Sequence, residues 1–361
     1  MSKIIKLFDV NFGKKENDAI NRVLKSKFWA SGSGVGNVAK FELQFKKFVN
    51  SRHCIAVSNG TAALHLALAM EEIKNKEVIL PSLSFVSTAH AVIYNGGKPV
   101  FVDVEPGTLC MDPSKIEDAI TKKTKVILPV HFGGMPCNLT KMKKICEKYS
   151  LSLVEDAAHA TGSSYNNKMI GSHGKAVCFS FHPVKNLAMP TGGVITLNDS
   201  NDGKTRDVLK SLRWCGISNR QGPKYDVSYL GWNYYMNEFS AAIGLVQLKK
   251  LKKMNNIRKN IAKRYFKEIQ NKNKMPYNKD CAYHLYWIQV SKRNEFMKKM
   301  KENNIETGIH YLPIHKMKYY TGKKLPITES VGKKIVSIPI HANLTESEVT
   351  KVIKFVNKFS D

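Results

Sequence analysis

The chain alternates stretches in which apolar residues recur every three or four positions, typical of amphipathic helices, with short runs of β-branched residues, typical of strands. Several of these runs are apolar throughout, as expected of strands that are covered on both faces. From residue 60 onward, strands and helices alternate, which predicts an α/β fold with a mainly parallel, doubly wound sheet. The predicted strands are residues 77–81, 99–104, 125–132, 151–156, 177–181 and 193–197.

The pattern changes after residue 237, where a long helical stretch begins that could lead out of the first domain. The elements expected from there on are helices over 238–260, near 295–303 and after Thr345, and strands near 284–290 and 334–339. Thr345 is the predicted N-cap of the last helix, because acidic residues follow it in the first turn. We therefore predict a large domain over residues 1–250, with an N-terminal arm, and a smaller α+β domain over 251–361.

Composition favours a soluble cytoplasmic protein that does not associate with membranes. Apolar residues make up 43% of the 361 positions, and no apolar run approaches the roughly 18 residues that cross a bilayer. The N-terminus lacks the apolar stretch of a secretory signal. The seven cysteines form no CxxC pair and no zinc-ligand spacing, so we expect reduced cysteines and no metal site.

The net charge of +28 is unusual and raises the possibility of a polyanionic partner. Residues 241–361 hold 26 lysines and arginines against nine aspartates and glutamates. Most of these lysines recur at helical spacing, as over 248–254, which is typical of the solvated side of a helix. Because no basic stripe is interleaved with aromatic residues, we expect a lysine-rich surface and no nucleic acid, although an anionic small substrate fits this charge.

The segment 58–68 has the composition of a phosphate-binding helix start. A polar turn that contains Gly60 leads into a helix that is apolar on nearly every face. The free amide groups of Gly60, Thr61 and Ala62, together with the helix dipole, form a seat for a phosphate. A well-capped core helix without any ligand would give the same pattern.

A carboxylate and an imidazole follow the predicted strand over 151–156. Asp156 ends this strand between apolar neighbours, and His159 comes three residues later. A carboxylate in such a poorly hydrated place stays charged only beside a cation, and a protonated pyridinium nitrogen is one such cation. The alternative is an N-cap aspartate with a packed histidine.

The strand over 177–181 delivers the hydroxyl of Ser180, and Lys185 follows in a short loop. A lysine that is held in a closed site loses proton affinity and becomes a nucleophile toward an aldehyde. A single loop lysine is ordinarily just solvated, so this interpretation depends on the two preceding segments.

Together these segments resemble the DegT/StrS-type sugar aminotransferases, which are fold-type I, pyridoxal-phosphate-dependent enzymes. The resemblance covers essentially the whole chain. Its segments here are 28–36, 58–68, 81–85, 102–104, 129–134, 155–160, 180–186, 231–236, 310–315 and 337–340.

The resemblance implies a role for each matching position. Lys185 corresponds to the lysine that carries pyridoxal 5'-phosphate, Asp156 to the carboxylate at its ring nitrogen, and His159 to the neighbour of its ring hydroxyl. The other cofactor-binding positions correspond to Gly60, Thr61 and Ser180 at the phosphate, Phe85 on the ring face, and Asn233 from the second subunit of a homodimer. We assign His310 and Tyr311 to the substrate side, with packed strand residues as the alternative.

The activity that the resemblance implies is transfer of an amino group from an amino acid, usually L-glutamate, to a nucleotide-linked keto-sugar for glycan biosynthesis. A 4-keto-6-deoxyhexose is our first choice, and a 3-keto-sugar is the alternative. Lys185 argues against the related sugar dehydratases, in which histidine replaces the lysine. A non-catalytic regulator or polyanion-binding protein on the same fold is the remaining alternative.

Three positions depart from the family pattern. Many members have an acidic residue where the stretch 188–193 has none, and arginine where Tyr235 stands. Cys215 stands where many members of the family have a histidine before a glycine. In relatives these loops approach the sugar or the subunit interface, so the departures weaken any inference about the substrate.

Overall fold

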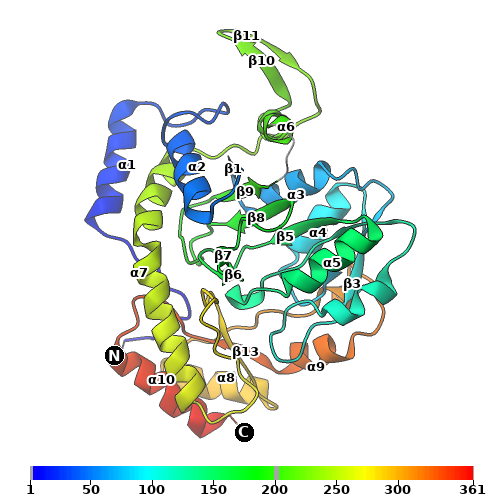
Figure 1. The fold of residues 1–361 in the computed structure, drawn as a ribbon. Coiled ribbons are helices and arrows are strands. Elements are labelled where there is room, and N and C mark those ends of the chain that lie inside the picture. The colour runs from blue at the N-terminus through cyan, green and yellow to red at the C-terminus, as the bar shows by residue number, and fades with distance from the viewer. Residues whose placement is uncertain (1–2, 199–202, 361) are drawn as a thin grey trace.

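The computed structural model, which describes residues 3–198 and 203–360, is built around a seven-stranded sheet (Figure 1). The strands, in the spatial order β1-β9-β8-β5-β4-β2-β3, are β1 (His53–Val57), β9 (Gly193–Leu197), β8 (Ala176–Ser180), β5 (Ser152–Asp156), β4 (Thr124–Ile127), β2 (Glu77–Pro81) and β3 (Lys98–Val102). Only β9 runs antiparallel to its neighbours in this sheet. The predicted mainly parallel α/β sheet is therefore confirmed.

Both faces of the sheet are covered, as the continuous apolar runs predict. Successive side chains of a strand point to opposite faces, and in β1 Ile55 and Val57 join one buried cluster while Ala56 joins another. Helices α3 (Gly60–Ala69), α4 (Ser87–Tyr94) and α6 (Lys204–Leu212) contribute to the first cluster; α2 (Gly36–Val49), α5 (Leu139–Tyr149) and α7 (Glu238–Glu268) contribute to the second. This is the doubly wound arrangement.

The strand predictions differ from the structure mainly at the ends. Two predicted strands continue too far: β3 ends at Val102, and β4 ends at Ile127. Beyond Ile127 the chain enters a short 3₁₀ turn over Phe132–Gly134, in which Gly133 has a φ of 62°. The pattern missed β1, the strand at the other edge of the described sheet from β3.

Helix α7 links the sheet to the C-terminal part of the chain (Figure 1). It was predicted over 238–260 and continues to Glu268, because buried Ile261, Ala262 and Tyr265 extend its apolar side. The expected domain boundary at residue 250 lies inside this helix, so the division into 1–250 and 251–361 stays a prediction. Helix α1 (Lys14–Ser26) packs against α7.

The C-terminal part holds a small antiparallel pair, β12 (Tyr286–Gln289) with β13 (Ile335–Ile338), and helices α8 (Arg293–Glu302), α9 (Pro326–Lys334) and α10 (Glu346–Phe359). The N-cap at Thr345 is confirmed, since its side chain accepts from the Glu348 amide in a capping box. Helix α9 was not predicted. The N-terminal segment joins this part through a bridge between Ile5 and Ile305.

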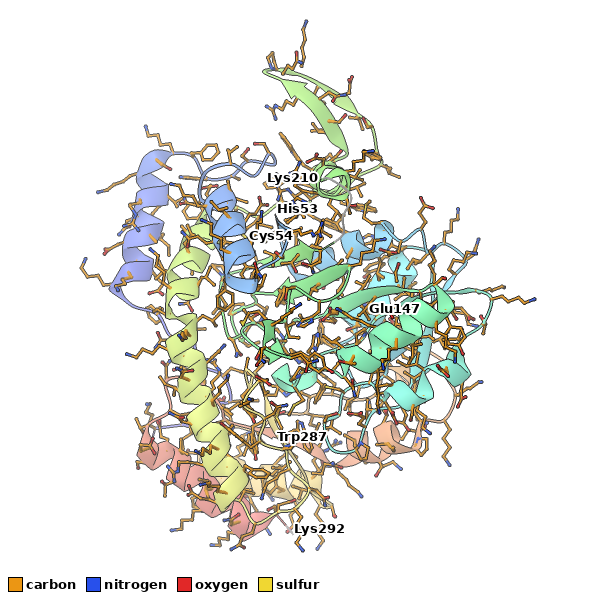
Figure 2. All side chains as sticks on the ribbon, viewed as in Figure 1. His53, Cys54, Glu147, Lys210, Trp287 and Lys292 are labelled. Atoms are coloured by element: carbon orange, nitrogen blue, oxygen red, sulfur yellow. The ribbon has the colours of Figure 1, made fainter. Side chains whose placement is uncertain are left out.

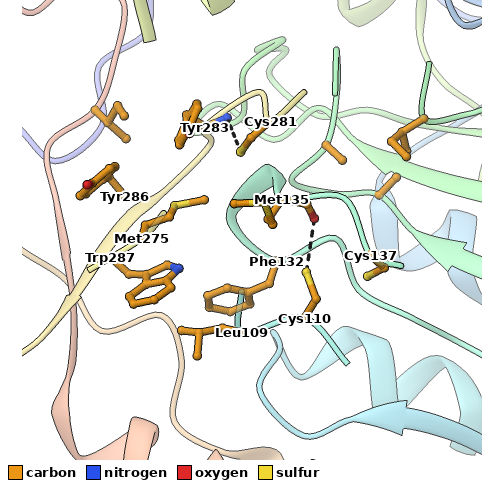
Figure 3. Close-up of a cluster of buried hydrophobic side chains, with 14 of the residues drawn as sticks. Leu109, Cys110, Phe132, Met135, Cys137, Met275, Cys281, Tyr283, Tyr286 and Trp287 are labelled. Atoms are coloured by element: carbon orange, nitrogen blue, oxygen red, sulfur yellow. Dashed lines mark hydrogen bonds between the residues drawn. The ribbon is translucent and has the colours of Figure 1, made fainter. Parts of the chain in front are cut away.

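One buried core connects the sheet layer with the C-terminal part. Phe132 and Leu109 come from the sheet side and lie with Met275 and Trp287 in a single cluster (Figure 3). Within it the Cys110 Sγ donates to the Met135 carbonyl at 3.4 Å. Trp287, labelled inside the molecule in Figure 2, is 1% exposed. The two parts are therefore packed as one body rather than loosely tethered.

Several smaller findings bear on the sequence predictions. All seven cysteines are free, and six of them are buried. No group of metal-binding side chains occurs in the described part of the chain. A search of the same residues finds no helix that is long and apolar enough to cross a membrane.

A hairpin that the sequence did not predict extends away from the body of the molecule (Figure 1). It consists of β10 (Ile217–Gln221) and β11 (Lys224–Val227). Val227 is 62% exposed and Leu230 is 92% exposed. Such apolar exposure on a projecting element is typical of a surface that another chain covers.

Asp103 supplies a cap to helix α9 from a distant point of the chain. Its carboxylate accepts hydrogen bonds from the amides of Ile327 and Thr328 and from the Thr328 hydroxyl, at 3.0, 2.7 and 2.6 Å. These amides belong to the first turn of α9, where the backbone N–H groups have no acceptor within the helix. The cap therefore ties the end of β3 to the C-terminal part.

We expect Asp103→Ala to lower the free energy of unfolding by about 2–3 kcal/mol, because it leaves buried donors without an acceptor. Thermal and urea melts at one protein concentration measure this loss. Asp226→Ala, on the exposed strand β11, is the matched control and should change stability by less than about 0.5 kcal/mol. Equal effects of the two substitutions would contradict the capping role.

Candidate active site

The candidate site lies at the carboxyl ends of two neighbouring parallel strands. Asp156 is the last residue of β5, and Ser180 is the last residue of β8. The two strands pair in register, with Asp156 opposite Cys178. Because parallel strands end at the same edge of a sheet, both side chains are delivered to one place, where ligands bind in open α/β sheets.

The residues of the predicted phosphate seat lie together at the start of α3. The side chain of Asn59 caps this helix by accepting from the Ala62 amide at 2.9 Å, so the prediction that this amide is free for a phosphate was wrong. The amides of Gly60 and Thr61 lie in the first turn, where the helix offers them no acceptor. Gly60 packs directly on Ser180, since a Cβ at position 60 would lie 2.7 Å from the Ser180 Cβ. The structure thus brings together three residues that the sequence predicted.

Asp156 is held as a buried acceptor. Its Oδ2 accepts from the Thr88 hydroxyl at 2.8 Å and its Oδ1 from the Ala158 amide at 3.1 Å. Burial raises the pKa of Asp156, while these hydrogen bonds and the charge of Lys185 act in the opposite direction. Sequence reasoning missed Thr88, which sits in α4 and carries no motif of its own.

Lys185 lies in the loop after β8, partly buried. Burial lowers its pKa from 10.5 to about 8, and the carboxylate of Asp156 counteracts part of this effect. The Nζ atom lies 3.4 Å from Nε2 of His284. Sequence reasoning also missed His284, a histidine just before β12 that no local pattern distinguishes.

Three histidines surround the lysine and stay uncharged. Burial lowers the pKa of His159, His284 and His310, and the nearby positive charge of Lys185 lowers these pKa values further. The pKa of His310 falls to about 4. Nδ1 of His159 accepts from the Gly133 amide at 3.2 Å, so the ring proton sits on Nε2. That proton is donated to the Tyr311 hydroxyl at 3.1 Å.

The predicted substrate residues have different surroundings. Tyr311 contacts His159 and lies 6.0 Å, ring to ring, from the exposed Phe85. His310 instead makes a hydrogen bond of 3.0 Å to Ser337 on β13. Tyr311 is therefore part of the cluster around Lys185, and the substrate roles of both residues stay a prediction.

Asn233 is exposed and lies on the segment that leads from the hairpin to α7. Its backbone forms a bridge with Trp214. Within the described part of this chain it is not brought into contact with Gly60, Thr61 or Ser180. A contribution from a second subunit, as the resemblance implies, stays a prediction.

These residues fit pyridoxal 5'-phosphate. A helix start packed on a serine offers a phosphate seat, a buried carboxylate suits a cationic ring nitrogen, and an amine of lowered pKa suits an aldehyde. Fold and site together define the class of fold-type I, pyridoxal-phosphate-dependent enzymes.

The comparisons with known proteins place the chain within that class. The model of the DegT/DnrJ/EryC1/StrS aminotransferase family matches residues 11–357. The chain therefore belongs to this family, and it is a pyridoxal-phosphate-dependent aminotransferase that acts on sugars.

Individual relatives cover nearly the whole chain. It is 36% identical over 368 residues to the spore coat polysaccharide biosynthesis protein SpsC of Bacillus subtilis (strain 168), covering 95% of this chain and 94% of SpsC. Among solved structures, Helicobacter pylori PseC, an aminotransferase involved in the biosynthesis of pseudoaminic acid, is 27% identical with a TM-score of 0.92 over 99% of each chain. A family aminotransferase from Brucella abortus is 29% identical with a TM-score of 0.89, over 96% of this chain and 95% of its own.

The lowered pKa of Lys185 predicts how the cofactor-free protein captures pyridoxal 5'-phosphate. Only the uncharged amine attacks the aldehyde, so the rate should rise with pH around a midpoint of about 8. Asp156→Asn should move the midpoint to lower pH, because the Asp156 charge raises the pKa of Lys185.

Initial rates of the visible absorbance change across the pH range measure this midpoint. Free Nα-acetyl-lysine is the control, since it reports the titration of the cofactor itself. A midpoint near the ordinary lysine value of 10.5 would show that Lys185 is not desolvated.

Proposed function

We propose that the chain transfers the amino group of L-glutamate to a nucleotide-linked keto-sugar, most simply a 4-keto-6-deoxyhexose, for glycan biosynthesis in the cytoplasm. The observation that carries this proposal is the pairing, at one sheet edge, of a lysine of lowered pKa with a buried carboxylate and a phosphate seat. In this proposal Lys185, Asp156 and His159 are catalytic. The cofactor-binding residues are these three with Gly60, Thr61, Phe85, Ser180 and Asn233.

Lys185 has the proton affinity that its proposed role needs. When bound, pyridoxal 5'-phosphate holds an amine covalently and withdraws electrons from the carbon beside it. The donor's α-proton then has to be accepted and returned by a base near neutral pH. With a pKa of about 8, the Nζ of Lys185 exists in both charge states under such conditions.

Asp156 and His159 fix the electrostatics of the site. A cationic partner at Asp156 relieves the cost of burying its carboxylate, and the Thr88 and Ala158 donors orient the oxygens toward that partner. His159 stays neutral, with its proton directed to Tyr311, and therefore adds no positive charge near Lys185. The Lys185 amine therefore titrates beside Asp156 and among uncharged histidines.

The relatives support a sugar in a polysaccharide pathway. SpsC is named for spore coat polysaccharide biosynthesis, and PseC acts in the biosynthesis of pseudoaminic acid. We propose the 4-keto position because it is the first choice that the family resemblance suggests, and amination of a 3-keto-sugar is the alternative. His310 and Tyr311 are proposed to face the sugar.

A homodimer with shared active sites accounts for two features of the single chain. Asn233 is exposed, and so are Val227 at the end of the hairpin and Leu230 just after it. In the proposed dimer the second copy covers these apolar side chains and receives Asn233 at its cofactor phosphate.

The purified protein, loaded with the cofactor, should absorb near roughly 410–430 nm, and L-glutamate should shift this band to roughly 330 nm. Lys185→Ala should abolish the response because it removes the attacking amine. Lys292→Ala, at an exposed lysine labelled in Figure 2, is the matched control and should behave like the unaltered protein. A protein that bound no cofactor, or whose spectrum ignored every amino donor, would contradict the proposed function.

Shared sites predict complementation between two inactive variants. Neither Lys185→Ala nor Asn233→Ala should form a complete site alone, whereas a mixed dimer contains one site with both residues intact. Mixing the two under dissociating conditions and reassembling them should restore the glutamate-dependent spectral change in part of the sites. Restoration would be absent if each chain built its own site.

A further inference from the structure

Two buried hydroxyl groups stand in line behind the carboxylate of Asp156. Ser84 follows β2, and Thr88 lies in the first turn of α4; the two residues are 3% and 1% exposed. The Ser84 Oγ lies 2.7 Å from the Thr88 Oγ1, which in turn lies 2.8 Å from the Asp156 Oδ2. Buried polar groups cost free energy unless they are paired, and here each member of the line is paired with the next.

The hydrogen bonds of this line run in one direction. A hydroxyl has one proton to donate, and an ionised carboxylate only accepts. The Thr88 proton therefore goes to Asp156, and Ser84 must donate to Thr88. In the reverse direction the Ser84 proton would need another acceptor, yet Ser84 Oγ has no hydrogen-bond partner besides Thr88 among residues 3–198 and 203–360. The line thus suits an Asp156 that has lost its proton.

The start of α4 is fixed at a second point, which keeps Thr88 in place. The hydroxyl of Thr61, in the predicted phosphate seat, donates to the Ser87 Oγ at 2.8 Å. Ser87 immediately precedes Thr88. Two adjacent residues of α4 therefore connect the phosphate seat with the carboxylate of Asp156.

Thr196 shows what a structural threonine hydroxyl looks like in the same molecule. It is 0% exposed, and its Oγ1 donates to the Gly171 carbonyl at 2.8 Å. A backbone carbonyl does not titrate, so this bond serves packing alone. Thr88 donates instead to a group that titrates, and a hydrogen bond to the charged form of such a group favours that form.

Thr88 is also the closest side-chain influence on Asp156. The titratable groups that act on this carboxylate or feel its charge are Lys185, His131, Tyr311 and Cys178. Within the described part of the chain none of the four forms a hydrogen bond with it. Its two donors there are the Thr88 hydroxyl and the Ala158 amide. Of these two, only the hydroxyl can be removed by substitution without changing the backbone.

We propose that Ser84 and Thr88 are positioning residues that hold Asp156 in its ionised form and thereby keep a proton on the ring nitrogen of pyridoxal 5'-phosphate. The inference rests on the proposed function, which assigns Asp156 to that nitrogen. Without the two donors, the N–H bond of the ring breaks in part of the molecules and the proton forms an O–H bond with Asp156. A ring without this proton withdraws electrons less strongly, so the two hydroxyls preserve the reactivity of the cofactor.

The first measurement follows the protonation of Asp156 in the cofactor-free protein. NMR of the labelled carboxyl carbons of the aspartates across the pH range gives the pKa, and Asp156→Asn identifies the signal. Thr88→Val removes the hydroxyl but keeps a branched side chain, Thr88→Ser keeps the hydroxyl, and Ser84→Ala removes the first donor. Thr196→Val is the matched control.

Thr88→Val should raise the pKa of Asp156 by roughly one to two pH units, because a hydrogen bond to a charged group is lost. Burial already raises this pKa, and the Thr88 bond acts against that effect. Ser84→Ala should raise the pKa by a smaller amount, and Thr88→Ser should leave it close to that of the unaltered protein. Thr196→Val should lower the melting temperature without changing the pKa of Asp156.

The second measurement uses protein loaded with pyridoxal 5'-phosphate that is labelled at the ring nitrogen. The NMR shift of this nitrogen reports whether it carries a proton. At neutral pH the unaltered protein and Thr196→Val should show the protonated nitrogen. The signal of Thr88→Val should move toward the unprotonated position, and Thr88→Ser should return it.

The inference is overturned if Thr88→Val leaves the pKa of Asp156 unchanged, if Thr196→Val moves it equally, if Thr88→Ser does not restore it, or if the ring-nitrogen signal of Thr88→Val equals that of the unaltered protein. Failure of the proposed function looks different, since the unaltered protein would then lack the glutamate-sensitive absorption band.

Discussion

The cost of taking charge out of water governs the arrangement of this site. A lysine and a carboxylate lie at the same buried edge, and burial shifts both pKa values toward the neutral forms, downward for Lys185 and upward for Asp156. Their mutual attraction offsets part of that cost. Positive charge on a neighbouring imidazole would push the pKa of Lys185 lower still, and the surrounding histidines are kept neutral by the same burial. Desolvation thus sets the reactivity of the lysine.

The end of β5 is rigid because a second buried pair clamps it. His131 accepts from the Cys137 amide through Nδ1 and donates from Nε2 to Glu155 at 2.8 Å, with both side chains fully buried. Glu155 precedes Asp156 and points to the opposite face of the sheet. The backbone amide of His131 also donates to the Asp156 carbonyl at 3.1 Å. The strand end that carries the Asp156 carboxylate is therefore held in place on both faces.

The sequence predicts what is local and leaves out what is brought together by folding. Five of the seven sheet strands end within two residues of their predicted ends. Strands that are covered on both faces are apolar throughout, so the sequence marks them clearly. Asp156 and Ser180 are the last residues of their strands and Lys185 follows β8, and ligands in such folds bind at these strand ends. Thr88 and His284 lie in a helix and a loop far from these residues in sequence, and their importance comes from their contacts with Asp156 and Lys185 rather than from a pattern. The projecting hairpin was missed because its strands are only five and four residues long, and most of their side chains are exposed rather than packed on a core.

The three departures from the family pattern, separate in sequence, form one region of the structure. The Cys215 amide donates to the Trp232 carbonyl at 2.9 Å, which places Cys215 beside the segment that holds Asn233 and Tyr235. In that segment the Tyr234 carbonyl accepts from the Ser58 amide. The Ser58 carbonyl in turn accepts from Thr191, within the stretch that lacks the acidic residue. The segments that carry the three departures are therefore linked to one another through Ser58 and Trp232, close to the start of α3. Asp156 ends β5 and Lys185 lies in the loop after β8, so the departures fall outside the two segments that carry these side chains.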